Sequence, residues 1–295
     1  MYKVLRSSLL SVYAAIILVP CMIVITGAFK TDFEIYTKPL SLPAKWSFDN
    51  FRKLFVESNI AKPFLNSVTV AVFSVLITLL FASLAAYAIS RLMTITGKVL
   101  FLLFSLGLAI PGQVNIIPIF QLFVKLNLNN SLIGLILVNI ALTLPISIFI
   151  LSAFFKDLPK EMFECAGMDG AGQFRIYRSI ALPLSKPALG ATAIFLFVIC
   201  WNDLLYPLML ITETSKKTLP LVLIDYKGEY FASYSMQFAA ILVASLPMVV
   251  MYLFMQRTFQ AGLSQRSVQD TKKPDGFPSG ALRVSQPKAR WPAHL

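Results

Sequence analysis

Six long apolar segments constrain the fold of this chain more than any other feature. A helix needs roughly 20 apolar residues to cross a bilayer, and 57% of the 295 residues are hydrophobic while only 14% are charged. Alternating segments of about ten residues, typical of a transmembrane barrel, do not appear. We predict an all-α integral membrane protein with spans near residues 9–29, 65–90, 99–123, 132–155, 187–211 and 237–255.

The basic residues predict how these spans are oriented. Lys3 and Arg6 precede a first span that is longer than a signal-peptide core and lacks a clear cleavage site, so we expect an uncleaved anchor with a cytoplasmic N-terminus. With that start, the cytoplasmic segments hold 16 Lys and Arg and the external loops hold 10, which favours both termini in the cytoplasm. The net charge of +12 therefore reports membrane orientation and gives no evidence for nucleic-acid binding.

Composition also excludes most catalytic and metal chemistry. The only histidine is His294, and the three cysteines form no C-x-x-C pair. The only Gly-Lys pair, Gly97-Lys98, lacks the upstream glycine and the following Ser or Thr of a phosphate-binding loop. We expect no catalytic residue, no bound metal and no ATP site on this chain.

Several spans contain proline, which removes a backbone hydrogen bond and permits a kink. Two interpretations of these prolines stay open. They reflect the ordinary proline content of membrane helices, or they allow the helices to bend around a pathway. The residues concerned are Pro20, Pro111, Pro118, Pro145, Pro207 and Pro247.

The loop 156–186, between the fourth and fifth spans, is the most informative segment. Asp157 is a suitable N-cap and Pro159 falls near the first helical position, which predicts a helix to about Met168. Asp169-Gly170 is a turn signal, and a second short helix should run from Ala171 to Leu182-Pro183. Both helices are amphipathic, and their apolar faces fit packing on the chain's own surface as well as docking on a partner.

This loop resembles the E-A-A loop of ATP-binding cassette (ABC) importer permeases. Glu164-Cys165-Ala166, three residues, Gly170, nine residues and Ile180-x-Leu182-Pro183 match that pattern in residue type and spacing, apart from Cys165, where the family usually has Ala. Cysteine is small, so we expect little loss of function from this departure.

Other segments resemble the carbohydrate-importing permeases in particular. These segments are Phe29-Lys30, Leu42-Pro43, Phe48-Asp49-Asn50-Phe51 and Trp201-Asn202-Asp203 followed by Pro207-Leu208. The whole layout resembles the smaller, six-span permease of the maltose-importer type, over most of the predicted permease domain 1–265. Beyond it, residues 266–295 are rich in proline and polar residues, and we expect a disordered cytoplasmic tail.

The resemblance implies a transporter in a bacterial or archaeal cytoplasmic membrane. It implies a heterodimer with a second permease, two ATPase subunits that bind ATP and Mg²⁺, an extracytoplasmic solute-binding protein and membrane lipid around the spans. It also implies that Glu164 makes a polar contact to an ATPase, that Phe163 and Met168 make apolar ones, and that Gly170 sets the bend. The coupling residues implied are Phe163, Glu164, Cys165, Ala166, Met168, Asp169, Gly170, Ile180, Leu182 and Pro183.

Two further sets of residues are candidates for function. The external loop 212–236 is polar and aromatic, and the resemblance implies that it docks on the binding protein, with packing on the partner permease as the alternative; its aromatic residues are Tyr226, Tyr230, Phe231 and Tyr234. Asp203 is the only acid within a span, which by itself suggests a functional site. The substrate-path candidates are Gln113, Asn115, Asn139, Trp201, Asn202 and Asp203, with interhelical hydrogen bonds of about 1 kcal/mol each as the alternative.

Other classes of protein remain open at this point. An ABC importer permease for a non-sugar solute shares the E-A-A loop. An ion-coupled secondary transporter would show inverted repeats and paired ionisable groups in the membrane, whereas this sequence has one such group and no clear repeat. A membrane enzyme would need a catalytic set that the sequence does not offer.

Overall fold

The computed structural model describes residues 2–91, 95–225 and 233–271, and the regular structure in these ranges is helical throughout. Four helices contain stretches long and apolar enough to cross a membrane unbroken. They are α1 (Tyr2–Gly27), α4 (Ala61–Arg91), α7 (Leu132–Lys156) and α14 (Tyr234–Thr271). The predicted domain boundary at residue 265 therefore falls inside α14, and most of the predicted tail lies outside the described residues.

Two further candidates for membrane spans are pairs of helices that are joined at a bend. The first joins α5 (Ile95–Gly107) to η1 (Gly112–Asn115) and α6 (Ile116–Lys125) through a bend of 81°. The second joins the segment Gln173–Leu184 to α11 (Lys186–Trp201) through a bend of 75°. Counting each bent pair as one span gives up to six spans among the described residues.

The sequence predicted spans 99–123 and 187–211 as single segments, and the structure interrupts both. The first is interrupted between Gly107 and Gly112, where Pro111 adopts an extended conformation directly before η1. In the second, α11 stops at Trp201 and α12 (Leu205–Leu210) follows after a turn. Pro207 lies in the first turn of α12 and lacks the N–H that would bond to the Asp203 carbonyl four residues earlier.

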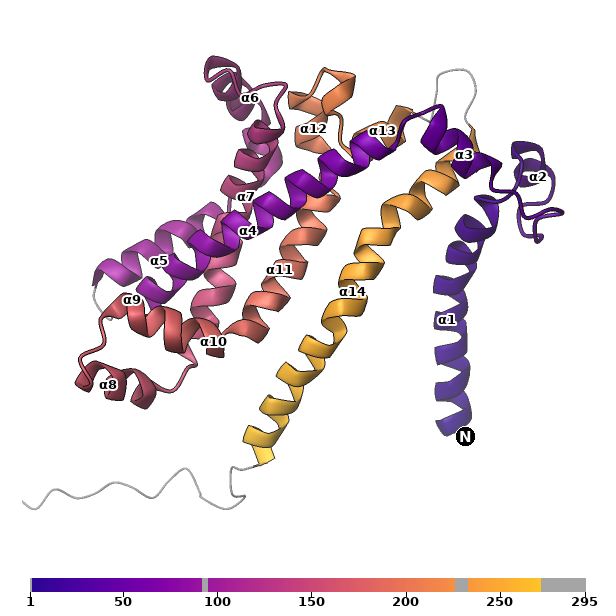
Figure 1. Ribbon diagram of the computed structural model, residues 1–295. Coiled ribbons are helices and arrows are strands. Elements are labelled where there is room, and N and C mark those ends of the chain that lie inside the picture. The colour runs from indigo at the N-terminus through magenta and orange to yellow at the C-terminus, as the bar shows by residue number, and fades with distance from the viewer. Residues whose placement is uncertain (1, 92–94, 226–232, 272–295) are drawn as a thin grey trace, which may run out of the picture.

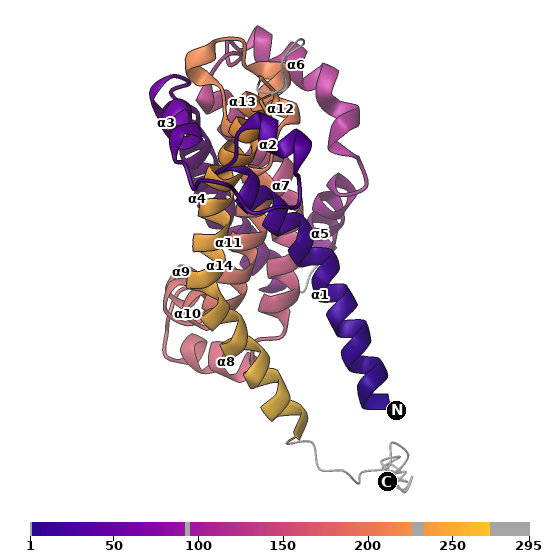
Figure 2. The ribbon, with the colours of Figure 1, turned by 90° about the vertical axis from the view of Figure 1, so that its right-hand side faces the viewer.

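The short helices gather at the two ends of the long ones (Figure 1). One end carries α2 (Asp32–Thr37), α3 (Asp49–Val56), α6, α12 and α13 (Leu219–Asp225). The opposite end carries α8 (Lys160–Met168), α9 (Gln173–Ile176), the π-helical turn η2 (Tyr177–Ala181) and α10 (Leu182–Leu184). The N-terminus and the last turns of α14 lie at this same end in both views (Figures 1 and 2).

The centre of the fold is the seam between α4 and α7, which α11 and α14 extend. A row of small residues on α4 faces inward, about one turn apart and fully buried, and small residues allow two helices to approach closely. Across the seam, the hydroxyl groups of Thr78 and Thr143 are 3.2 Å apart. The small buried residues on α4 are Ala71, Ser74, Thr78, Ala82 and Ala86.

Helix α1 is attached differently from the rest. It packs on α14, and large apolar side chains are exposed along its length, including Leu9, Tyr13 and Ile16. A helix with an apolar surface on most sides is stable only in a medium as apolar as itself. The exposed surface of α1 therefore requires lipid or another membrane helix as its neighbour.

Candidate functional site

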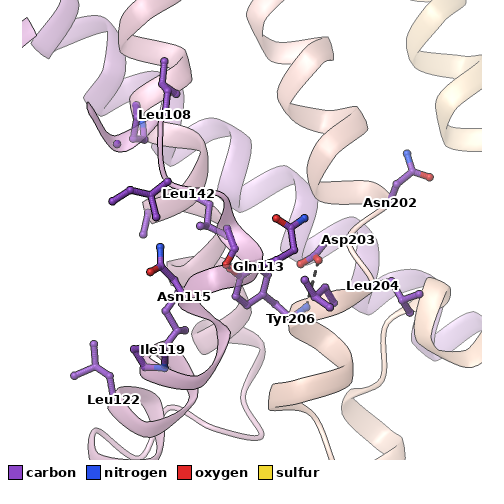
Figure 3. Close-up of a pocket in the computed structure, with 17 residues that line it drawn as sticks. Leu108, Gln113, Asn115, Ile119, Leu122, Leu142, Asn202, Asp203, Leu204 and Tyr206 are labelled. Atoms are coloured by element: carbon purple, nitrogen blue, oxygen red, sulfur yellow. Dashed lines mark hydrogen bonds between the residues drawn. The ribbon is translucent and has the colours of Figure 1, made fainter. Parts of the chain in front are cut away.

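A cavity of about 840 Å³ opens where the two interrupted segments meet α7 (Figure 3). Its walls come from the end of α5, from η1 and α6, from the middle of α7 and from the turn between α11 and α12. Most of the wall is apolar, and the polar groups are amides, a tyrosine ring and one carboxylate. The polar lining residues are Gln113, Asn115, Asn202, Asp203 and Tyr206.

The turn between α11 and α12 is held in place by Asp203 and Tyr206. Asp203 precedes α12, and its Oδ1 accepts a hydrogen bond of 3.4 Å from the backbone N–H of Tyr206. The Tyr206 hydroxyl then donates a hydrogen bond of 2.9 Å to the Gly112 carbonyl in the other interrupted segment. Figure 3 shows Gln113 and Asp203 facing the same space from these two segments. The cavity thus lies where the two breaks are joined.

The structure separates the six predicted substrate-path residues into two groups. Gln113, Asn115, Asn202 and Asp203 line the cavity. Trp201 does not line it: its ring is buried, and its Nε1 donates a hydrogen bond of 3.1 Å to the Ala244 carbonyl of α14. Asn139 is also absent from the lining and is buried within α7.

Sequence reasoning missed Tyr206 as a lining residue. Its position three residues after Asp203, at the start of a short helix, was the available signal, because an acid before a helix commonly accepts a hydrogen bond from the N–H of the third residue on. The lining also includes leucine, isoleucine and proline side chains that composition alone cannot separate from lipid-facing ones, among them Leu108, Ile119, Leu142 and Pro145.

The lining determines what chemistry the cavity can perform. Its amides and its phenol can exchange hydrogen bonds with a polar ligand, and its apolar walls can pack against that ligand's non-polar faces. Among the described residues there is no group of three or more histidine, cysteine or acidic side chains able to hold a metal ion. The lining therefore suits the binding of a polar ligand that also has non-polar faces.

The second candidate region is the segment of α8 and the helices after it. Helix α8 begins at Lys160 with Pro159 as its N-cap, two residues later than the predicted Asp157 cap. Gly170 ends this helix with a φ of +79°, a conformation that glycine adopts without a steric penalty, as predicted for the turn. The second helix begins at Gln173 rather than Ala171 and continues through Leu184.

Most of the predicted coupling residues point away from the chain. Met168 is 81% exposed, and the remaining exposed ones are Glu164, Cys165, Asp169, Gly170 and Pro183. Ala166, Ile180 and Leu182 are half-buried.

Phe163 differs from the other coupling candidates in the direction of its ring. The ring is buried inside this chain, in the same apolar cluster as Tyr87 and Ile176. The guanidinium carbon of Arg91, at the end of α4, lies 3.3 Å from the centroid of the Phe163 ring. The inner face of this loop therefore packs on the chain itself, which was one of the two interpretations, and the outer face is exposed.

Of the four aromatic residues predicted to dock a binding protein, Tyr234 alone belongs to the described residues. Tyr226, Tyr230 and Phe231 lie outside the described residues. Tyr234 is described: it starts α14, and its ring meets that of Tyr36 on α2 edge-on, with centroids 5.4 Å apart.

These features define a helical membrane protein with interrupted spans around a mostly apolar cavity that carries a few polar groups, and with an exposed helical segment at one end. Residues 78–265 match the family of binding-protein-dependent transport system inner membrane components, and the chain belongs to this family. It is therefore an inner membrane component of an ABC transporter, as the resemblance implied.

Two relatives and one solved structure place the chain more closely. It is 34% identical over 266 residues to the diacetylchitobiose uptake system permease protein NgcG of Streptomyces coelicolor, covering 90% of this chain and 88% of that one. It is 32% identical over 252 residues to the melibiose/raffinose/stachyose import permease protein MelC of Bacillus subtilis, covering 85% and 91%. Its fold is similar to a chain of a bacterial ABC transporter that imports the acidic polysaccharide alginate, with a TM-score of 0.77, 21% identity and coverage of 88% and 96%.

Proposed function

We propose that this chain is a permease subunit that moves a sugar or oligosaccharide inward across the cytoplasmic membrane, driven by ATP hydrolysis on partner subunits. The observation that carries the proposal is the cavity between the two interrupted segments, whose polar lining is made of amides, a phenol and one carboxylate. Such groups suit a ligand rich in hydroxyl groups. The names of the relatives NgcG and MelC, both of which describe sugar uptake, support this substrate class.

In this proposal the end of the molecule that carries α8, α9 and α10 faces the cytoplasm. The distribution of basic residues supports this orientation. The N-terminus and the last described turns of α14 then lie in the cytoplasm, and α2, α3, α12 and α13 lie outside. The cavity lies nearer the external end, beside α6 and α12.

The exposed face of α8 is the proposed contact with one of two ATPase subunits. Glu164 and Met168 are one helical turn apart on this face and both are exposed, so one polar and one apolar side chain are available side by side. Gly170 directs the chain back toward α9 after that contact. ATP and Mg²⁺ belong to the partner subunits in this proposal.

Four of the predicted path residues form the proposed sugar path on this subunit: Gln113, Asn115, Asn202 and Asp203. A second permease subunit completes the path, and the exposed apolar surface of α1 supports such a neighbour in the membrane. The loop 212–236, with Tyr226, Tyr230, Phe231 and Tyr234, is the proposed docking point of the solute-binding protein outside.

The test is reconstitution of the chain with its partner permease, its ATPase and its binding protein in liposomes with ATP inside. We expect uptake of a labelled oligosaccharide that stops when the ATPase or the binding protein is omitted and that continues when ionophores abolish ion gradients. Uptake that needs an ion gradient and no ATPase would instead identify a secondary transporter. Uptake of a non-sugar solute by the same complex, with every tested sugar excluded, would overturn the substrate class alone.

A further inference from the structure

Three successive turns of α4 hold the segment formed by α8, α9 and η2. The hydroxyl groups of Ser83 and Tyr177 are 2.8 Å apart. One turn later, the Tyr87 hydroxyl donates a hydrogen bond of 3.2 Å to the side-chain Oε1 of Gln173. These contacts join parts of the chain that are 94 and 86 residues apart. The segment that follows α7 in sequence is therefore attached to α4.

The third turn carries Arg91, whose guanidinium lies on the face of the Phe163 ring in α8 at 3.3 Å. The Arg91 Nε and Nη2 atoms are buried and have no hydrogen-bond partner among the described residues. The Arg91 side chain as a whole is half-buried, and the face of the Phe163 ring covers its guanidinium; such a contact gains strength away from water. A planar guanidinium can stack flat on the ring, whereas an ammonium approaches a ring only as a compact point charge, as Lys156 does over Phe101 at 4.5 Å.

The other end of α4 is attached just as specifically. The Asn66 side-chain amide donates hydrogen bonds to the carbonyl oxygens of Ser215 (3.0 Å) and Lys217 (2.9 Å). Next to it, the Ser67 hydroxyl accepts a hydrogen bond of 2.8 Å from the backbone N–H of Leu219, the first residue of α13. These contacts hold the segment between α12 and α13 against the first turns of α4.

Helix α4 is also built to be stiff. It has 31 residues, which makes it about 46 Å long. Of the four long helices, α1, α7 and α14 contain an internal proline, and the one proline of α4, Pro63, lies in its first turn, where it breaks no helical hydrogen bond. A displacement at one end of α4 is therefore carried to the other end rather than absorbed by a kink.

We propose that α4 is the rod that carries motion between the ATPase-facing segment and the external segment around α13, and that Arg91 is the positioning residue that fixes α8 to it. This inference rests on the proposed function. Arg91 touches neither sugar nor nucleotide in this scheme. It acts by holding Phe163, so that a movement of α8 displaces α4 instead of sliding over it.

The experiment compares sugar imported with ATP hydrolysed in the reconstituted complex, for wild type, Arg91→Gln and Arg91→Lys. We expect both variants to hydrolyse ATP at a basal rate near that of the wild type and to import roughly three- to tenfold less sugar per ATP. A second measurement reports on the external end of α4: the stimulation of ATPase activity by the binding protein. We expect this stimulation to fall in the same variants. Asn66→Ala, at the far end of the rod, should lower this stimulation as well.

The control is Ser90→Ala, one residue before Arg91. The Ser90 hydroxyl donates only to the Tyr87 carbonyl within α4, so the variant should keep the wild-type ratio. A second check is Phe163→Leu combined with Arg91→Gln, and the double variant should be no worse than the poorer single one. If Arg91→Gln does not assemble, Arg91→Lys carries the test with the same expectation.

Two outcomes would overturn the inference. One is a wild-type ratio of sugar to ATP in both Arg91 variants. The other is a parallel loss of import and ATPase activity, because it would mean that Arg91 only stabilises the fold. A wild-type complex without ATP-driven import would instead refute the proposed function itself, and the inference with it.

Discussion

The Tyr206 hydroxyl donates a hydrogen bond of 2.9 Å to the Gly112 carbonyl, and this contact joins the two interrupted segments at their breaks. A helix break leaves backbone carbonyls without their usual partners, and inside a membrane such groups must be satisfied by protein or by water in a cavity. Tyr206 satisfies one of them from a segment 94 residues away. The two breaks therefore support each other, and the cavity depends on both.

Tyr206→Phe should loosen this junction while keeping the ring in place. Loss of a single hydrogen bond lowers the free energy of unfolding by about 1 kcal/mol, and we expect a slightly lower thermal transition of the purified complex. We expect sugar uptake to fall several-fold at unchanged basal ATPase activity, because the cavity wall becomes mobile. Unchanged uptake would show that the junction has no part in transport.

Gly170→Ala and Gly172→Ala form a matched pair. Neither glycine has another atom within 4 Å of the position that a new Cβ would take, so sterics with neighbours are equal. Gly170 has a φ of +79°, where alanine costs about 1–2 kcal/mol, whereas Gly172 has a φ of −67°. Gly170→Ala should reduce sugar imported per ATP and Gly172→Ala should not.

Gly170→Pro extends the same test, because proline fixes φ near −65°. We expect it to uncouple ATP hydrolysis from uptake while the permease still assembles, as judged by copurification with its partner subunits. Wild-type transport by this variant would contradict the coupling role of the turn.

Trp201 and Asn202 should respond differently although they are adjacent. The Trp201 ring is buried between Phe197 and Phe64, with centroid distances of 5.6 and 5.7 Å. Its Nε1 also donates a hydrogen bond to the Ala244 carbonyl. Trp201→Phe should lower the free energy of unfolding by about 1–2 kcal/mol and leave the apparent KM for sugar unchanged. Asn202→Ala should raise that KM with a smaller effect on stability. Thermal shift and initial uptake rates measure the two effects separately.

Glu34 makes the stability of α2 and of residues 38–44 dependent on pH. Hydrogen bonds from the backbone N–H groups of Thr31 and Ala44 lower the pKa of this carboxyl below its usual value of 4.5. A lowered pKa means that the carboxylate stabilises the folded segment above pH 4.5 and that this contribution is lost as the pH falls through the lowered value.

Glu34→Gln should therefore make α2 and residues 38–44 easier to cleave by protease at pH 7, and the difference from wild type should disappear in acid. Glu57→Gln, on the neighbouring helix α3, makes the same change of charge and is the control. A difference that persists at low pH would mean that the effect does not come from the ionised carboxylate.

The sequence predicted the spans well where helix continuity follows from local properties. The apolar runs of α4 and α7 match their predicted ranges within a few residues, because hydrophobic length alone decides them. Proline was a poor guide to breaks: Pro145 and Pro247 lie inside continuous helices, while Pro111 lies at a break. What separates these cases is whether neighbouring segments satisfy the freed backbone groups, and that is a property of the tertiary structure.

The site was predictable only in part for a similar reason. Polarity within an apolar run identified Gln113 and Asn202 as unusual, and both line the cavity. It could not distinguish them from Trp201 and Asn139, since polar side chains buried in the protein interior and polar side chains that line a cavity are of the same residue types. Packing of the Phe163 face on the chain itself was one of the two interpretations left open, and the sequence could not decide between them because Arg91, the partner of this ring, lies on a helix distant in sequence.

The small residues on α4 have a consequence for natural variation in this chain. Helices α4 and α7 can pack this closely only because the side chains between them are small. Hydrophobicity is therefore a misleading measure of whether a substitution there is conservative. Ala82→Leu or Ala86→Val would keep the polarity of the segment, yet each would push α7 away along the whole seam. Ser74→Ala keeps the size of the side chain and removes only a long hydrogen bond of 3.5 Å to the Ile136 carbonyl of α7, so its effect would be smaller. At these positions the size of the new side chain, more than its polarity, therefore decides whether a substitution is tolerated.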